Sequence, residues 1–166
     1  MNNFKIFLGI FATLAVSRFV PHPPNFTTLI ALSFYVPILI GRKGIFIVFV
    51  SFVITDFLIE YHFITHWTWG SILLIGLASK FFSRAIQVRY LGLVLSTLVF
   101  FLLSNFGVWS LGSYGYTFAG LINCFILAIP FYGNTLISSL FFGTCIELML
   151  FIFYRYNKKT KSIIKR

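Results

Sequence analysis

Residues Phe101–Asn134 read FLLSNFGVWSLGSYGYTFAGLINCFILAIPFYGN, and the topology of the whole chain depends on this stretch. An apolar run ends near Asn105, and a linker rich in Gly, Trp and Tyr follows it. A second apolar run, Thr117–Ile129, is closed by Pro130 and the Gly133 turn, which are typical breaks in a helical pattern. If Thr117–Ile129 crosses a bilayer, the chain has seven spans and its ends lie on opposite sides. If it turns back, there are six spans and the ends share a side.

Composition predicts one integral membrane domain over residues 1–166. Hydrophobic residues make up 59% of the chain and charged residues only 10%, whereas a soluble domain has about 25% charged residues. Both cysteines, Cys124 and Cys145, lie in apolar runs. They are therefore expected to be buried thiols, because a disulfide framework would place them in loops.

Hydropathy predicts six membrane-spanning helices. Their ranges are Phe4–Val20, Phe26–Ile40, Ile45–Tyr61, Gly70–Phe82, Tyr90–Ser104 and Thr135–Tyr156, and a basic tail, 157–166, follows the last. Several of these runs are shorter than the roughly 20 residues needed to cross a bilayer. Aromatic residues at their ends and snorkelling Lys and Arg side chains must make up the missing length. The first run lacks a small-residue cleavage site, which favours a retained helix over a signal peptide.

The distribution of positive charge favours six spans over seven. With a cytoplasmic N-terminus, six spans place twelve of the thirteen Lys and Arg residues inside, and Arg18 alone outside. Seven spans would move Arg155 and the five basic residues of the tail outside. We therefore expect both termini in the cytoplasm of a bacterial cell, a multi-pass inner-membrane protein, and Thr117–Ile129 as a re-entrant or tilted helix on the outer side. Because the basic residues alternate with apolar runs, no nucleic-acid partner is expected.

Aromatic and amide side chains collect on the predicted outer side. Such groups line small-molecule sites, although the same residues could form an ordinary interfacial aromatic belt. The residues predicted to line a substrate pocket are His22, Asn25, Asn105, Trp109 and Tyr116, with Trp67 as a possible lid.

Two sets of charged residues within the spans need partners. Arg18 and Asp56 are predicted to form a structural ion pair, with a direct ligand role as the alternative; Glu60 shares a helix face with Asp56. Glu147 lies within the last span with no basic residue near it in sequence, so it is expected to be protonated. It could couple protons, contact a polar group of another helix, or face a partner subunit.

Motifs for metal binding and catalysis are weak. His62-x3-His66, with acidic residues upstream, has a metal-like composition but lies on a short aromatic linker, which favours interfacial histidines. Neither a nucleophile elbow nor a P-loop occurs, so an enzyme, a metal and a cofactor are not expected. The small residues Gly9 and Thr13 form a stripe that serves either internal packing or docking to another subunit.

Three blocks of sequence carry a family resemblance. They are FVPHPPNFT at residues 19–27, the FLLSNFGVW of residues 101–109, and AIPFYGNT at residues 128–135. These blocks, the PHPPNF motif above all, resemble an uncharacterised family of small bacterial transport proteins. That family is similar to the substrate-binding S components of energy-coupling-factor vitamin transporters.

The resemblance implies a six-helix, S-component-like protein that binds a vitamin-like substrate in an outward-facing pocket. Uptake would occur alone or on a transmembrane and ATPase energising module. The first helix has Gly9-x3-Thr13 where S components often have Ala-x3-Ala, which leaves docking to such a module open. Two alternatives are a small proton-coupled carrier that uses Asp56 or Glu147, and an accessory subunit that does not transport. The identity of the substrate stays open.

Overall fold

The computed structural model describes residues 3–59 and 61–164, and every regular element in these residues is a helix. In chain order the helices are α1 (Asn3–Phe19), α2 (Leu29–Ile40), α3 (Arg42–Ile59), α4 (Thr65–Ala78), the short 3₁₀ helix η1 (Ser79–Phe82), α5 (Ile86–Ser110) and α6 (Phe118–Ile164). The all-helical prediction is therefore confirmed for the described residues. Glu60, Lys165 and Arg166, which entered the predictions above, lie outside them.

Helix α2 is the centre of the bundle. Its residues 29–37 are all buried, and it contacts each of the other five α-helices. A helix that is apolar on every side is buried on every side, which explains why α2 carries no charged residue. Phe34 and Tyr35, both fully buried, supply the largest side chains of the core.

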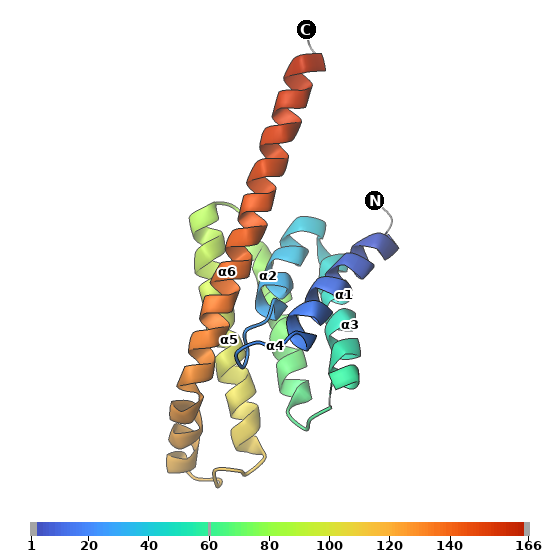
Figure 1. Ribbon diagram of the computed structural model, residues 1–166. Coiled ribbons are helices and arrows are strands. Elements are labelled where there is room, and N and C mark those ends of the chain that lie inside the picture. Colours follow the sequence, from blue (N-terminus) through green and yellow to red (C-terminus); the bar gives the residue numbers. More distant parts are fainter. Residues whose placement is uncertain (1–2, 60, 165–166) are drawn as a thin grey trace.

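Successive α-helices run in alternating directions (Figure 1). The start of α1, the α2–α3 turn, the η1–α5 turn and the end of α6 lie at one end of the bundle. The α2–α3 turn is tight because Gly41 adopts a φ of 73°, a conformation that glycine reaches without a steric penalty. Six basic residues lie toward this end, which we call the cationic end: Lys5, Arg42, Lys43, Lys80, Arg84 and Arg89.

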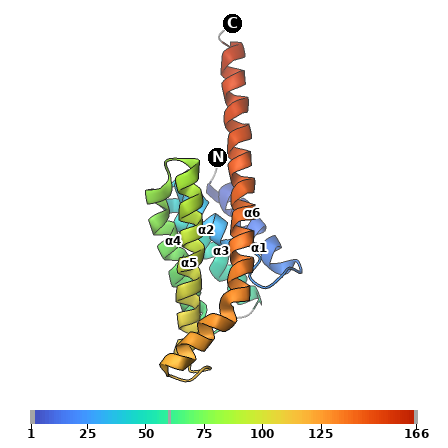
Figure 2. The same ribbon diagram turned by 90° about the vertical axis from the view of Figure 1, so that its left-hand side faces the viewer.

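Helix α6 corrects the prediction for the stretch that opened the analysis. Thr117–Ile129 was predicted to be a separate re-entrant or tilted segment, but from Phe118 it is the first part of a single 47-residue helix. Pro130 lies inside this helix. Proline removes one backbone hydrogen bond and bends a helix without necessarily ending it, and Figure 2 shows α6 bending in the part that contains it.

Two other boundaries differ from prediction in ways that affect the site. Helix α4 begins at Thr65 rather than Gly70, so most of the predicted aromatic linker is helical. Helix α5 begins at Ile86, directly after extended Ala85, and this places Arg89 in its first turn. Residues 65–69 and Arg89, which were predicted to lie in connections, are therefore parts of helices, and the helix fixes the direction of each side chain.

Two of the described helices are long and apolar enough to cross a membrane. They are α5, with 25 residues, and residues Phe118–Tyr156 of α6. Helix α2 is apolar but has only 12 residues, which corresponds to about 18 Å. The chain is thus an all-helical protein with two possible membrane-spanning helices.

Candidate ligand-binding cavity

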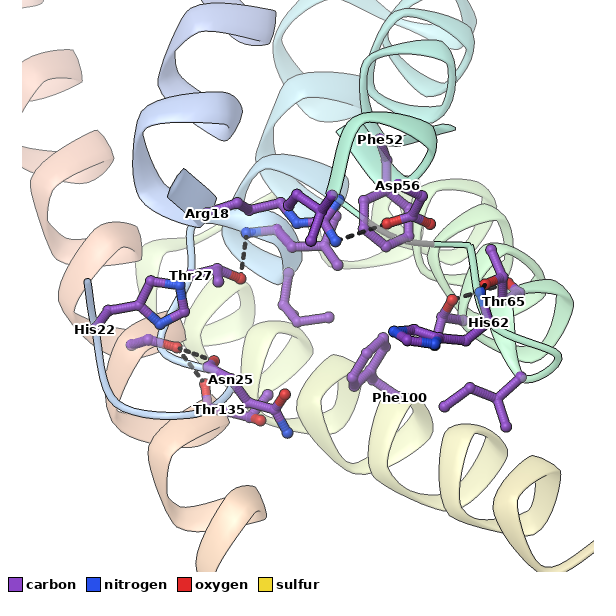
Figure 3. Close-up of a pocket in the computed structure, with 16 residues that line it drawn as sticks. Arg18, His22, Asn25, Thr27, Phe52, Asp56, His62, Thr65, Phe100 and Thr135 are labelled. Atoms are coloured by element: carbon purple, nitrogen blue, oxygen red, sulfur yellow. Dashed lines mark hydrogen bonds and ion pairs between the residues drawn. The ribbon is translucent and has the colours of Figure 1, made fainter. Parts of the chain in front are cut away.

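A polar cavity of about 350 Å³ lies at the end of the bundle opposite the cationic end. All six α-helices, the α1–α2 loop and the α3–α4 loop contribute to its wall (Figure 3). Its polar lining consists of Arg18, His22, Asn25, Thr27, Asp56, His62, Thr65, Thr68, Thr135 and Ser138. Aliphatic side chains and the rings of Phe52 and Phe100 complete it. A concave site of mixed apolar and hydrogen-bonding character suits a small organic molecule.

Arg18 and Asp56 form the charged part of this wall. Arg18 Nη2 lies 2.6 Å from Asp56 Oδ1, and Arg18 Nη1 donates to Thr55 Oγ1 at 2.5 Å. Trp69 Nε1 donates to the second carboxylate oxygen at 2.7 Å. The guanidinium also lies 4.7 Å above the centre of the Phe52 ring. The opposite charges of Arg18 and Asp56 make the pair neutral as a unit. Because both carboxylate oxygens have partners, the pair is held in one geometry.

The contact between Arg18 and Asp56 is the one expected from the sequence, and its structural role stays a prediction. The sequence analysis did not predict Trp69 as a partner of Asp56. The sequence did contain an indication of this contact, because an indole N–H can only donate and an acidic side chain nearby can accept its hydrogen bond. Glu60, which was predicted to share a helix face with Asp56, lies outside the described residues.

The proline-rich loop between α1 and α2 is fastened to α6. Asn134 Nδ2 donates to Pro24 O at 3.0 Å, and Ser138 Oγ lies 3.5 Å from Asn25 O. Asn25 itself has a φ of 64°, in the left-handed region that asparagine tolerates better than most residues. His22 Nδ1 lies 2.7 Å from the carbonyl oxygen of the next residue. The loop therefore has a defined shape where it borders the cavity.

Several hydroxyl groups of the lining are arranged as acceptors. Thr135 Oγ1 donates to Phe131 O at 2.9 Å, Thr68 Oγ1 donates to Thr65 O at 2.8 Å, and Ser138 Oγ donates to Thr135 O at 3.0 Å. A hydroxyl whose hydrogen is used in this way still has lone pairs. The cavity thus favours a ligand that brings its own hydrogen-bond donors.

A smaller cavity of about 170 Å³ adjoins the first. The two share Asn25, Thr68, Phe100 and Thr135 in their linings, and the smaller one extends to Asn105. Asn105 Nδ2 donates to Phe101 O at 2.7 Å, which leaves its amide oxygen and its second N–H for a ligand.

The predicted pocket residues therefore separate into two groups. His22 and Asn25 line the larger cavity, and Asn105 lines the smaller one.

The other three predicted pocket residues lie elsewhere. The Trp67 ring packs against Gly107 and Phe106 of α5, because the early start of α4 turns it toward that helix and away from a lid position. Trp109 and Tyr116 pack on each other at the α5–α6 connection, with ring centroids 6.4 Å apart.

Sequence reasoning missed Thr135 and Ser138 as lining residues. These two residues are three positions apart, which places them on one face of α6. This pair forms a polar stripe on an otherwise apolar helix, as Thr65 and Thr68 do on α4. Such a stripe is the sequence pattern from which these lining residues could have been predicted.

The histidine pair does not assemble a metal-binding group. His62 lines the cavity, whereas His66 is exposed with its Nδ1 3.4 Å from the Tyr61 hydroxyl. In residues 3–59 and 61–164, no three His, Cys, Asp or Glu side chains come together where a metal ion could be held.

Glu147 contacts polar groups of two other helices, which is one of the alternatives left open above, and its pairing with Arg89 argues against the protonated form expected from the sequence. Arg89 Nε and Nη2 contact its two carboxylate oxygens at 2.5 and 2.7 Å, and Tyr35 Oη donates to it at 2.9 Å. Arg89 reaches it because α5 starts earlier than predicted. This cluster joins α2, α5 and α6 toward the cationic end, twelve residues or about 18 Å along α6 from Thr135.

The comparisons with known proteins yield one match. The model of a protein family described as a family of unknown function, DUF6580, matches residues 1–162. No curated protein and no solved structure matches the chain.

Proposed function

The chain belongs to the DUF6580 family, and we propose that it is a multi-pass membrane protein that binds a vitamin-like small molecule for uptake into the cell. All six α-helices would lie in the bilayer, with the cationic end toward the cytoplasm and the polar cavity toward the outside. The protein would act alone or with an energising module, as the resemblance to S components implies.

The charge distribution supports this orientation. The basic residues cluster at the end that holds the start of α1 and the end of α6, while Arg18 at the other end is neutralised by Asp56. Cytoplasmic loops of membrane proteins carry an excess of Lys and Arg. A helix that is shorter than the thickness of the bilayer can be accommodated by local thinning of the bilayer and by snorkelling side chains.

The observation that carries the proposal is the cavity itself. It receives side chains from every α-helix, it contains a charged pair with satisfied partners, and it lies at the end of the bundle opposite the cationic end. Placing polar side chains inside so apolar a protein costs free energy. Polar groups at such positions therefore favour a functional role for the cavity.

The contacts of Glu147 favour the uptake component over a proton-coupled carrier that relies on this residue. Both of its carboxylate oxygens are engaged by Arg89, and a carboxylate paired in this way is stabilised in its charged form. We propose a structural role for Glu147.

The test is mass spectrometry of small molecules released from protein purified in native lipid particles. We expect a bound compound that is lost in Thr135→Val, since this change removes a cavity hydroxyl without changing the volume much. The matched control is Thr144→Val. Thr144 also donates to the carbonyl four residues earlier, but it is exposed on the outside of α6. Equal retention by both variants, or no bound compound in the parent protein, would contradict the proposal.

A further inference from the structure

An apolar groove of about 580 Å³ lies on the outside of the bundle, directly beside the polar cavity. Its walls come from the second half of α1, from the α1–α2 loop and from Phe142 of α6. Phe26 closes it on the loop side, with its ring centroid 6.0 Å from that of Phe142. Helix α1 packs on α2 and α3, which leaves this face of α1 bordering the groove.

The surface of the groove is apolar even at Thr13, Ser17 and Thr28, because their hydroxyl groups are already hydrogen-bonded. Thr13 Oγ1 donates to Gly9 O at 2.8 Å, and Ser17 Oγ lies 2.8 Å from Thr28 Oγ1. These hydroxyl groups satisfy one another or their own helix. Ala12 and Val16 supply the remaining α1 wall. An apolar chain can therefore lie in the groove without leaving a polar group unpaired.

The groove and the cavity are separated by a single layer of residues. Ser17 lines the groove and Arg18 the cavity, because consecutive residues of a helix point about 100° apart. In the same way Thr28 lines the groove and Thr27 the cavity. His22 lines both. The loop that carries His22 is thus the shared wall of the two hollows.

We propose that the ligand is a neutral amphiphile, with a hydroxyl-bearing head in the cavity and a hydrocarbon tail that passes His22 into the groove. The head is neutral because Arg18 and Asp56 already neutralise each other. It carries hydroxyl groups because Thr68, Thr135 and Ser138 offer acceptors. This inference rests on the proposed function and narrows its substrate class.

The position of His22, which borders both hollows, distinguishes this occupant from others that an apolar groove could accept, because a ligand that extends past this side chain would occupy both. A bilayer lipid or a helix of another subunit would contact the groove without any dependence on the cavity. The tail of a cavity ligand would depend on both hollows. The test therefore measures whether occupation of the groove requires an intact cavity.

The probe is a monoacylglycerol with a photoreactive diazirine at the end of its acyl chain, added to the full-length protein in lipid nanodiscs. We expect cross-links within residues 12–16 and at Phe142, mapped by peptide mass spectrometry. They should fall at least fivefold in Val16→Trp, which fills the groove from a lipid-exposed position, and in Thr135→Val, which alters the cavity. The controls are Leu77→Trp, at a similarly exposed position on α4, and Thr144→Val.

The outcomes separate the inference from the proposed function. Cross-links that persist in Thr135→Val show a bilayer lipid in the groove and overturn the inference. A purified compound that depends on Thr135 but has no apolar tail also overturns it, while the binding function stands. If no compound depends on Thr135, both the function and the inference are wrong.

Discussion

In the described residues, two arginine–carboxylate pairs lie toward the two ends of the bundle, and at each a third side chain completes the hydrogen bonding. At the cationic end Arg89, Glu147 and Tyr35 connect three helices that are far apart in sequence. Glu147 has 7% of its side chain exposed and Arg89 has 19%. Removing one partner from so buried a pair leaves the other charge uncompensated.

Glu147→Gln is therefore expected to destabilise the protein by about 3–5 kcal/mol, because Arg89 loses its counter-charge in a largely buried position. Thermal unfolding in detergent measures the change. The double variant Arg89→Met with Glu147→Leu should lose less stability than Glu147→Gln alone. Wild-type stability in Glu147→Gln together with lost uptake would instead assign Glu147 a coupling role.

Trp69→Phe tests the other pair. The substitution keeps an aromatic ring beside Phe49 and Phe57 but removes the indole hydrogen bond to Asp56. A hydrogen bond to a charged group is worth about 1.5–3 kcal/mol, and we expect a loss of stability in that range. Trp67→Phe is the comparison, and its Nε1 plays no part in the Asp56 contact. Equal effects of the two substitutions would mean that the Asp56 bond contributes little.

The two pairs differ in how far the sequence could predict them. Arg18 and Asp56 were matched because each is the natural partner for the other on a side with few charges. Arg89 was assigned to a cytoplasmic loop, and its partner Glu147 is 58 positions away. Nothing local in the sequence links them, since the contact depends on where α5 begins and on how α6 passes it.

At the scale of the element, the bend of α6 sets the position of the cavity residues. Asn134, Thr135 and Ser138 follow Pro130 within two or three turns, and they hold the α1–α2 loop and line the cavity. The direction of the helix after the bend therefore decides whether these side chains reach the loop.

Pro130→Ala should straighten α6, because alanine restores the missing backbone donor and removes the ring that obstructs the preceding turn. Spin labels at the exposed positions Phe118 and Tyr156 would report a longer distance in the variant, since a straight rod spans more than a bent one. We also expect weaker retention of the bound compound. An unchanged distance would mean that tertiary packing, rather than Pro130, imposes the bend.

The course of α6 could not be read from local signals. Pro130 and Gly133-Asn134 indicate a break, and in an isolated peptide they would favour one. Here α5 packs along α6 and supplies contacts that outweigh the local preference. The apolar runs, their order and the helical class were all predictable, because they depend on composition and periodicity, whereas the continuity of α6 depends on its neighbours.

At the scale of the whole molecule, charge and polarity are separated along one axis. The basic residues lie at one end, and the cavity with its neutral ion pair lies at the other. The antiparallel order of the six α-helices brings the start of α1 and the end of α6 to the same end (Figure 1). This separation is the basis for the proposed orientation in the membrane and for the proposed binding of an external ligand.

The orientation is tested most directly by labelling single cysteines in intact cells with a membrane-impermeant maleimide, after Cys124 and Cys145 have been replaced by alanine. Phe63→Cys lies in the exposed loop beside the cavity, and Lys43→Cys lies at an exposed position in the first turn of α3, at the cationic end. We predict that Phe63→Cys is labelled in intact cells and that Lys43→Cys is labelled only after the membrane is disrupted. Labelling of Lys43→Cys in intact cells, with Phe63→Cys protected, would contradict the proposed orientation and, with it, the uptake function.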